Sequence, residues 1–215
     1  MQTIPRTLVA LLLSALAAAP AVAKMPGRLG VRAGINLSAF GGEFGDVIEP
    51  DQRVAPNIAL VYEYPFAPKL SLHTEVGWSS KGGKTEFEST DPFGNSSPIK
   101  TEWRFDYLEV PLLMRGRFGS IGTVTPFFEL GPAISVTLSG KFEDDPHVIG
   151  EQNLKDDMKP IDLGWGAGAG VEFPAGPGHL GIEARYTRGF SDLFDLDNNF
   201  STINQAWTFA LSYTR

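Results

Sequence analysis

The sequence predicts an all-β fold, an eight-stranded antiparallel up-and-down β-barrel that spans a membrane. Eight segments alternate apolar with polar residues, as strands do when successive side chains point to opposite faces. The connections between these segments are alternately short and long, which is typical of bacterial outer-membrane barrels. An apolar leader at the start of the chain indicates export. The fold and the cellular location are therefore predicted together.

The leader covers residues 1–23. It has Arg6 near its start, a largely apolar run over residues 8–19, and Ala-Val-Ala at residues 21–23, which is the layout of a cleavable secretory signal. The apolar run is only about a dozen residues long, too short for a helix that crosses a bilayer. We predict cleavage before Lys24, which leaves residues 24–215 as one outer-membrane β-barrel domain.

Composition excludes several classes of protein. The chain has no cysteine, so it has neither a disulfide framework nor a lipid-anchored cysteine. Only Arg6 of the 18 basic residues lies in the leader, so the mature chain carries 17 basic against 25 acidic residues, a net charge of −8. An acidic chain without a basic cluster is a poor candidate for binding nucleic acid.

Four strands are expected in the first half of the mature chain, over residues 29–38, 54–64, 69–81 and 103–114. In the first, the odd positions are apolar and the even ones are Gly, Arg, Asn or Ser. In the fourth, Trp103, Phe105 and Tyr107 are placed on the outer face, after which Leu108 and the apolar residues that follow share that face. Such a change of phase predicts a β-bulge near Tyr107 and Leu108.

Four more strands are expected over residues 125–138, 161–173, 179–190 and 202–214. The second of these is the most regular, because every odd position from 161 to 173 is apolar or alanine and every even one is Asp, Gly or Glu. Thirteen residues suit a tilted strand that crosses a bilayer. Pro126 and Pro132 weaken the assignment of the strand at 125–138, since proline cannot donate to a strand ladder.

The connections after the second, fourth and sixth strands are short. The other four start near Ala39, Gly82, Ser139 and Ser191 and run for about ten to twenty residues. Short periplasmic turns and longer external loops are the pattern of an outer-membrane barrel, so both ends of the mature chain are expected in the periplasm.

A soluble lipocalin-type barrel would use the same strands with the apolar face inward, around a ligand. The aromatic residues of the apolar face lie near strand ends: Tyr62, Tyr64, Trp78, Trp103, Trp165, Phe173, Trp207 and Tyr213. Girdles of this kind border the apolar band of membrane barrels. Together with the leader and the loop lengths, they favour the membrane orientation.

Several segments also resemble a known family. They are Gly30-Val-Arg-Ala-Gly-Ile-Asn-Leu-Ser38, Asp106-Tyr-Leu-Glu-Val-Pro-Leu-Leu113, Pro126-Phe-Phe-Glu-Leu-Gly-Pro132, the glycine-rich strand at 161–173, and Glu183-Ala-Arg-Tyr186. The chain is similar in these segments to the PorT-like outer-membrane β-barrel domain family, from about Gly30 to Tyr213. The resemblance implies a fold and a location, and it implies no particular activity.

Charged residues are predicted on the inner face. They are Arg32, Glu75, Glu109, Glu129, Glu183 and Arg185, with His73 nearby. Glu75, Glu109, Glu129 and Arg185 are placed at similar heights, and Arg32, His73 and Glu183 slightly nearer the periplasm. Buried charges need partners, so we predict an Arg/Glu network inside the barrel. A network that fills and rigidifies the lumen is favoured over a gated ion path, and the glycines at 164–170 are interpreted as space for these side chains.

Catalytic, cofactor and metal sites are not expected. His73 and His179 lie toward the periplasmic ends, and His147 lies in an acidic loop without a matched serine. The glycines at 164–170 are spaced by two, unlike a nucleotide-binding loop. The acidic loops at 141–159 and 192–197 lack the spacing of an EF-hand, so solvated loops are favoured over calcium sites.

The predicted function is that of a monomeric, non-enzymatic outer-membrane barrel with a structural or surface-interaction role. A narrow channel for small solutes and an outer-membrane lipid-modifying enzyme are the alternatives. The expected partners are outer-membrane lipid, lipopolysaccharide and, during insertion, the barrel-assembly machinery.

Overall fold

The computed structural model describes residues 27–43, 45, 50–90, 96–145, 150–194 and 201–215. The elements are β1 (Arg28–Gly41), β2 (Asp51–Ala67), β3 (Leu70–Thr90), β4 (Ser96–Arg117), β5 (Thr125–Asp145), β6 (Gln152–Asn153), the 3-10 helix η1 (Lys155–Asp157), β7 (Ile161–Ala175), β8 (Gly178–Gly189) and β9 (Ile203–Thr214). No helix in this part of the chain is both long and apolar enough to cross a membrane.

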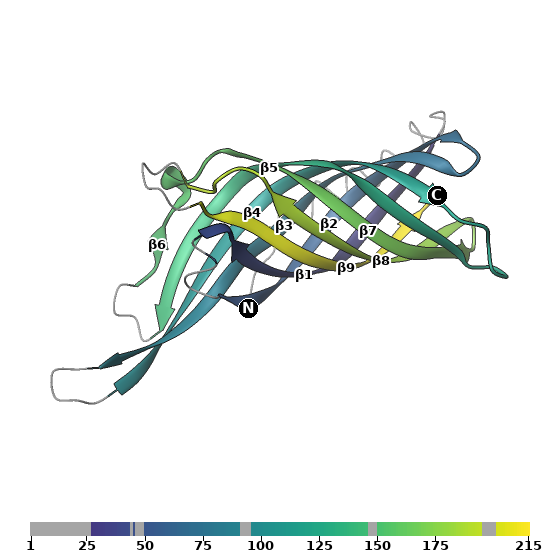
Figure 1. The fold of residues 1–215 in the computed structure, drawn as a ribbon. Helices are drawn as coiled ribbons and strands as arrows, with labels where there is room; N and C mark the ends of the chain where they lie inside the picture. Colours follow the sequence, from purple (N-terminus) through teal and green to yellow (C-terminus); the bar gives the residue numbers. More distant parts are fainter. Residues whose placement is uncertain (1–26, 44, 46–49, 91–95, 146–149, 195–200) are drawn as a thin grey trace.

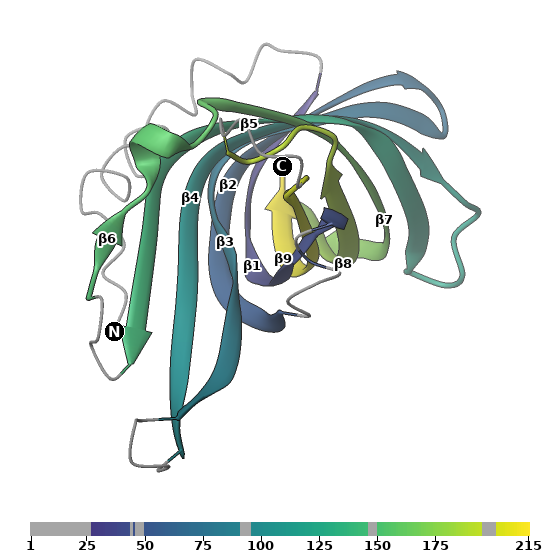
Figure 2. The ribbon, with the colours of Figure 1, turned by 60° about the vertical axis from the view of Figure 1, so that its left-hand side comes forward.

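Eight of these strands form a closed ring. Neighbours pair in the order β4-β3-β2-β1-β9-β8-β7-β5, and β4 pairs with β5 to close it (Figures 1 and 2). Every pairing is antiparallel, and the first and last strands meet along a seam from Gly30↔Thr214 to Gly41↔Ile203. The two-residue strand β6 lies outside the ring, on β5. The predicted eight-stranded antiparallel barrel is confirmed.

The two ends of the barrel have different connections. At one end the strands are joined by residues 68–69, 118–124 and 176–177, and Gly122 and Gly176 adopt positive φ angles there (63° and 60°). At the other end residues 42–50, 91–95, 146–160 and 190–202 join the strands. By the rule for outer-membrane barrels, the first end faces the periplasm and the second faces outward.

The segment at 82–102, expected to be a loop, is mostly strand. β3 and β4 pair without a break from Gly77↔Glu109 to Thr90↔Ser96, so their hairpin projects beyond the rest of the external end (Figure 1). The hydroxyls of Thr85 and Thr101, opposite each other in this extension, hydrogen-bond at 2.6 Å. β-branched residues and cross-strand pairs stabilise strands outside a membrane as well as inside it, so the apolar alternation alone underestimated their length.

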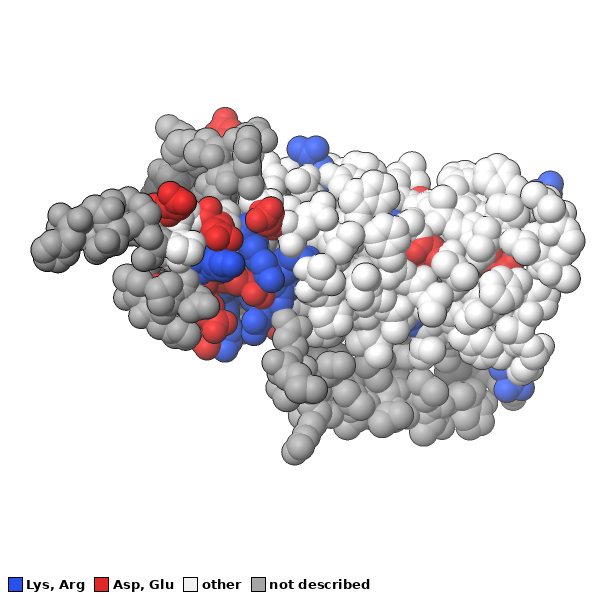
Figure 3. All heavy atoms as spheres, turned by 90° about the horizontal axis from the view of Figure 1, so that it is seen from below, with Lys and Arg blue, Asp and Glu red and all other residues white. Residues whose placement is uncertain are grey.

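The distribution of side chains is the inverse of that in a soluble barrel. Leu112, Leu130, Ile134 and Leu211 are 46 to 56% exposed on the outer face, whereas buried polar and charged residues outnumber buried apolar ones in the described chain. Figure 3 shows a broad outer surface almost free of charge, bordered at the external end by acidic and basic side chains. Such a surface is stable only against lipid, which excludes the lipocalin-type arrangement.

One group of aromatic residues lies on the outer wall. Trp165, Tyr186 and Trp207 come from three neighbouring strands, with ring centroids 5.8 Å and 5.3 Å apart along the series. Trp207 is 46% exposed on the outer face, and Trp165 lies on the same face because it contacts Tyr186, which contacts Trp207. Both positions agree with those expected for girdle residues.

The orientation predicted for Trp103, Phe105 and Tyr107 is wrong. Phe105 and Tyr107 are buried, and Trp103 packs against the inward-facing Phe40 at 5.6 Å between ring centroids. The register does shift at this height, since Asp106 pairs with Ser139 but Tyr107 pairs with Thr137. The extra residue is therefore on β5, between these two partners, and β4 keeps its phase throughout.

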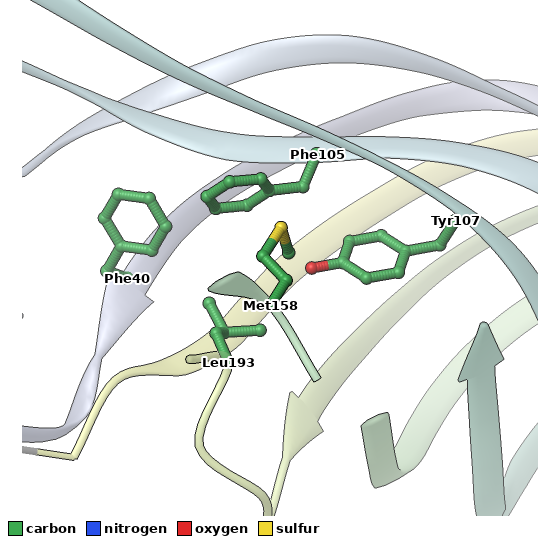
Figure 4. Close-up of a cluster of buried hydrophobic side chains, with 5 residues drawn as sticks. All are labelled: Phe40, Phe105, Tyr107, Met158 and Leu193. Carbon is green, nitrogen blue, oxygen red and sulfur yellow. The ribbon is translucent and has the colours of Figure 1, made fainter. Parts of the chain in front are cut away.

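These aromatic residues belong to an apolar cluster inside the external mouth of the barrel. The mouth cluster consists of Phe40, Phe105, Tyr107, Met158 and Leu193 (Figure 4). Met158 lies among the rings, and a bridge to Phe194 links its segment to the connection between β8 and β9. Met158 and Leu193, which come from two external connections, thus pack inward at the mouth and give the aromatic residues an apolar environment away from lipid.

Candidate functional site: the charged lumen

The inner face of the barrel carries five arginines and five glutamates that form one network of ion pairs. They are Arg28, Arg32, Arg115, Arg117 and Arg185 with Glu63, Glu75, Glu129, Glu172 and Glu183. The strict alternation of strand residues aims all of these side chains inward, because their neighbours in sequence face lipid. Formal charges balance within this set.

Arg185 on β8 lies at the centre. Its Nη2 contacts Glu75 Oε1 at 2.5 Å, Glu129 Oε1 at 2.7 Å and Glu183 Oε1 at 3.0 Å, and all four side chains are at most 4% exposed. Glu75 and Glu129 belong to β3 and β5, so one guanidinium joins three strands across the lumen.

Arg32 on β1 contacts two of the same carboxylates, those of Glu75 and Glu183. Its Nε donates to Glu183 Oε1 at 2.6 Å, and its Nη1 lies 3.5 Å from Glu75 Oε2. Nη1 also donates to Asn57 Oδ1 at 3.1 Å. Charge-assisted bonds of this kind hold both partners in one geometry.

Arg115 on β4 completes the centre, although the sequence reasoning did not include it. Its Nη2 donates to Glu129 at 2.6 Å and Glu183 at 3.2 Å, its Nη1 lies 3.4 Å from Glu63, and its guanidinium stacks 4.1 Å from the centre of the Phe127 ring. The predicted strand ends at Met114, three residues before the end of β4 at Arg117. Continuing the alternation from Glu109 by two residues at a time reaches Arg115 and Arg117, so the signal was present.

A second layer of charges lies nearer the periplasmic end. Arg117 contacts Glu63 at 2.5 Å and Glu172 at 2.7 Å, and Arg28 contacts Glu63 at 2.9 Å. His73 lies between the two layers, with its Nε2 2.8 Å from Glu75 Oε1 and its Nδ1 3.9 Å from Glu63 Oε2. Glu63 is not among the residues predicted for the network, yet it contacts Arg115, Arg117 and Arg28.

The structure separates Glu109 from the other five residues predicted for the network. Glu109 forms an ion pair with Lys81 and accepts a hydrogen bond from Ser135 Oγ at 3.4 Å. Arg32, Glu75, Glu129, Glu183 and Arg185 are all in direct contact through the pairs described above. Strand shear explains the difference, because residues at equal sequence distance from a strand end do not lie at equal height in a tilted barrel.

The glycines of β7 leave room for this network. A Cβ added to Gly168 would lie 3.2 Å from Arg185 Cβ, and one on Gly166 would lie 3.6 Å from Arg185 Cδ. A Cβ on Gly170 would approach to 2.5 Å of the Phe127 ring, on which Arg115 stacks. Bulkier residues on β7 would displace the central arginines.

A different set of charges lies on the projecting parts of β3, β4 and β5, beyond the apolar surface (Figure 3). These rim charges include Lys84, Glu102, Arg104, Lys141 and Glu143. Buried Arg53 donates from Nε to Glu102 Oε1 at 2.8 Å. Burial raises the pKa of Glu102, but the hydrogen bond from Arg53 and the charges of Arg53, Lys84 and Arg104 outweigh it, so the pKa lies below its usual value.

The histidines and acidic residues considered as candidates for catalysis or metal binding lie as follows. His73 is enclosed in the ion-pair network, His179 lies at the periplasmic end of β8, and His147 lies outside the described residues. The described part of the chain contains no group of three or more His, Cys, Asp or Glu side chains arranged to hold a metal ion.

A family model agrees with this architecture. The model described as "Outer membrane protein beta-barrel domain" matches residues 26–195. The chain belongs to this family. Membership in the outer membrane protein beta-barrel domain family places the chain in the bacterial outer membrane.

Three solved structures are similar to this chain. Neisserial surface protein A is 9% identical with a TM-score of 0.50, and the match covers 87% of this chain and 96% of that one. Ail of Yersinia pestis (14% identical, TM-score 0.42, 89% and 100% covered) and OprG of Pseudomonas aeruginosa (13%, 0.41, 88% and 96%) are also similar. At these identities the likeness concerns the fold alone. No curated protein sequence matches the chain.

Proposed function

We propose that this outer-membrane barrel has a structural or surface-interaction role and that its filled lumen does not conduct solutes. The observation that carries the proposal is the position of Arg185, whose guanidinium contacts carboxylates from β3, β5 and β8 at one height. Side chains that meet across the lumen obstruct a path for solutes at that level.

Two further features support a closed lumen. Arg115 and Arg32 add contacts to the same glutamates, so an ion would have to displace several charge-assisted bonds at once. The mouth cluster lies above them, and an apolar constriction opposes the passage of hydrated ions. Polar network and apolar cluster are independent barriers in series.

Planar-bilayer recording tests this proposal. The purified barrel should produce no steady conductance steps, whereas a porin in the same lipid produces them. The variant Arg185→Ala removes the central guanidinium, and Arg188→Ala, on the outer side of the same strand, serves as its control. Steady pores from the unmodified protein would refute the filled lumen and favour the narrow-channel alternative.

The projecting hairpin of β3 and β4 supports the surface-interaction part of the proposal. It carries the rim charges beyond the apolar surface, at the level where lipopolysaccharide headgroups and external partners are met. We propose that these charges contact lipopolysaccharide and that the barrel is a monomer. Lipopolysaccharide that stays bound through purification, and a one-chain mass by light scattering, are the expected results.

We also propose that the protein is not an enzyme. The described histidines lie away from the external leaflet, where a lipid-modifying site would need a nucleophile and a base within hydrogen-bond reach. A lipid-hydrolysis assay with outer-membrane lipid checks this, and turnover above that of a heat-denatured sample would overturn it.

Two finer assignments belong to the same proposal. Residues 1–23 act as a signal peptide, so the mass of the mature protein should correspond to a chain that begins at Lys24. We propose that the barrel-assembly machinery inserts the exported chain and that the chain is a PorT-like domain, an assignment that the motifs from Gly30 to Tyr186 support. Depleting that machinery should leave the chain without its heat-dependent migration on a gel.

A further inference from the structure

A small polar chamber lies inside the barrel between the Arg/Glu network and the mouth cluster. It is a cavity of about 30 Å³, enough for two or three water-sized particles. Its inner lining includes Lys81, Glu109, Ser135, Asp162, Thr187 and Asn204. Arg185 and Arg188 also form part of its wall. The charge of Arg185 is already shared among three glutamates, and Arg188 is an exposed residue on the outer side of β8 that forms no ion pair with the described lining carboxylates.

The chamber contains a carboxylate without an ion-pair partner. Asp162 is 7% exposed, and its side chain accepts a hydrogen bond from Ser191 Oγ at 2.7 Å, while no described Lys, Arg or His forms an ion pair with it. The charges that act on it are those of Lys81 and Glu109. Because Lys81 is bound to Glu109, these three residues leave one negative charge uncompensated.

A second, independent observation concerns Asn204. This residue is 3% exposed, and its Nδ2 donates to the Tyr107 hydroxyl at 2.7 Å. Its Oδ1 is buried and has no hydrogen-bond partner among the described residues. A buried amide oxygen is normally satisfied, so an unsatisfied one in the wall of a polar cavity indicates a missing donor or cation.

We propose that the chamber binds a small monovalent cation. Asp162 supplies the charge, and the hydroxyls of Ser135 and Thr187 with the amide oxygen of Asn204 supply the neutral oxygen ligands. Two carboxylates in the lining disfavour an anion. The absence of a third carboxylate or histidine, within the described part of the chain, disfavours a divalent ion, which takes more charged ligands.

Crystals of the intact barrel soaked in a thallium(I) salt provide the direct test, since thallium(I) replaces potassium and scatters anomalously. We expect an anomalous peak in the chamber, with Asp162 and Asn204 oxygens as neighbours. Replacing thallium with potassium should remove the peak. A chamber without anomalous signal at saturating thallium would refute the proposal, and would leave water as its content.

Thermal unfolding in solution tests the same proposal and can be applied to variants of the protein. The midpoint of thermal unfolding should rise with potassium chloride when N-methylglucamine chloride holds the ionic strength constant, because that organic cation is too large for the chamber. Asp162→Asn should weaken potassium binding at least tenfold, whereas Glu151→Gln, on the exposed connection after β5, should leave it unchanged. Equal potassium dependence in both variants would contradict the site.

Discussion

Replacing Arg185 by alanine removes the group that the three central glutamates share. The guanidinium contacts Glu75, Glu129 and Glu183 at 2.5 to 3.0 Å, all within a lumen where these side chains are at most 4% exposed. Removing one partner of a buried ion pair costs about 3–5 kcal/mol, because the remaining charge is left uncompensated. Arg32 and Arg115 still contact these glutamates, so we expect the lower end, about 3 kcal/mol.

Urea unfolding in lipid vesicles, followed by tryptophan fluorescence and by heat-dependent migration on a gel, measures this loss. Arg188→Ala is the matched control, since it removes the same side chain from the outer side of β8, and it should change the free energy of unfolding by less than about 0.5 kcal/mol. The double variant Arg185→Met/Glu129→Met removes one charge of each sign and should be more stable than Arg185→Ala. Equal stability of the two alanine variants would refute the reasoning.

Three further predictions concern the external half of the barrel. Phe105→Ala should lower the free energy of unfolding in urea by about 3 kcal/mol, because its ring is fully buried in the mouth cluster, whereas 51%-exposed Phe87 should tolerate alanine; equal losses would contradict a packed cluster. Gly82→Ala should cost more than about 2 kcal/mol in the same assay, because Gly82 has φ of 141° and a Cβ would collide with the Trp103 carbonyl oxygen. Gly119→Ala, which meets open space, should be neutral. Glu102→Gln should destabilise the barrel at pH 7 and not at low pH: the pKa of Glu102 is lowered by folding, so its contribution is complete above the ordinary carboxylate pKa of about 4.3 and is lost as pH falls through the lower folded value. A difference between Glu102→Gln and the unmodified barrel that persists at low pH would rule out this explanation.

The strand pattern could be predicted because it depends on local alternation. The outer face must be apolar at each second position wherever it meets lipid, so residues such as Leu130 and Leu211 identify their strands without knowledge of the fold. The pattern fails beyond the lipid, where β3 and β4 continue as a hairpin held by pairs such as Thr85 and Thr101. The orientation of Trp103 and Phe105 was predicted wrongly for the same reason. Where the outer face does not meet lipid, an aromatic side chain points to the side on which other apolar residues bury it, which here is the mouth cluster.

The lumen was predictable in composition but less so in contacts. Inward positions follow from alternation, so the side chains of Arg32, Glu75 and Arg185 could be predicted to point into the lumen. Which of them touch depends on the shear of the ring, which no single strand encodes, and Glu109 therefore pairs with Lys81 at a different height. Arg115 could have been predicted as a lumen residue if the end of its strand had been placed correctly.

The ion pairs of the lumen also constrain how the barrel can be assembled. Arg32 on β1 has its shortest contact with Glu183 on β8, and Arg185 on β8 has its shortest contact with Glu75 on β3. Strands that lie far apart in the chain thus neutralise each other, and an open sheet of the first few strands would bring unmatched charges toward hydrocarbon. Insertion and ring closure are therefore expected to be coupled, because the lumen charges are matched only once β8 has joined the ring.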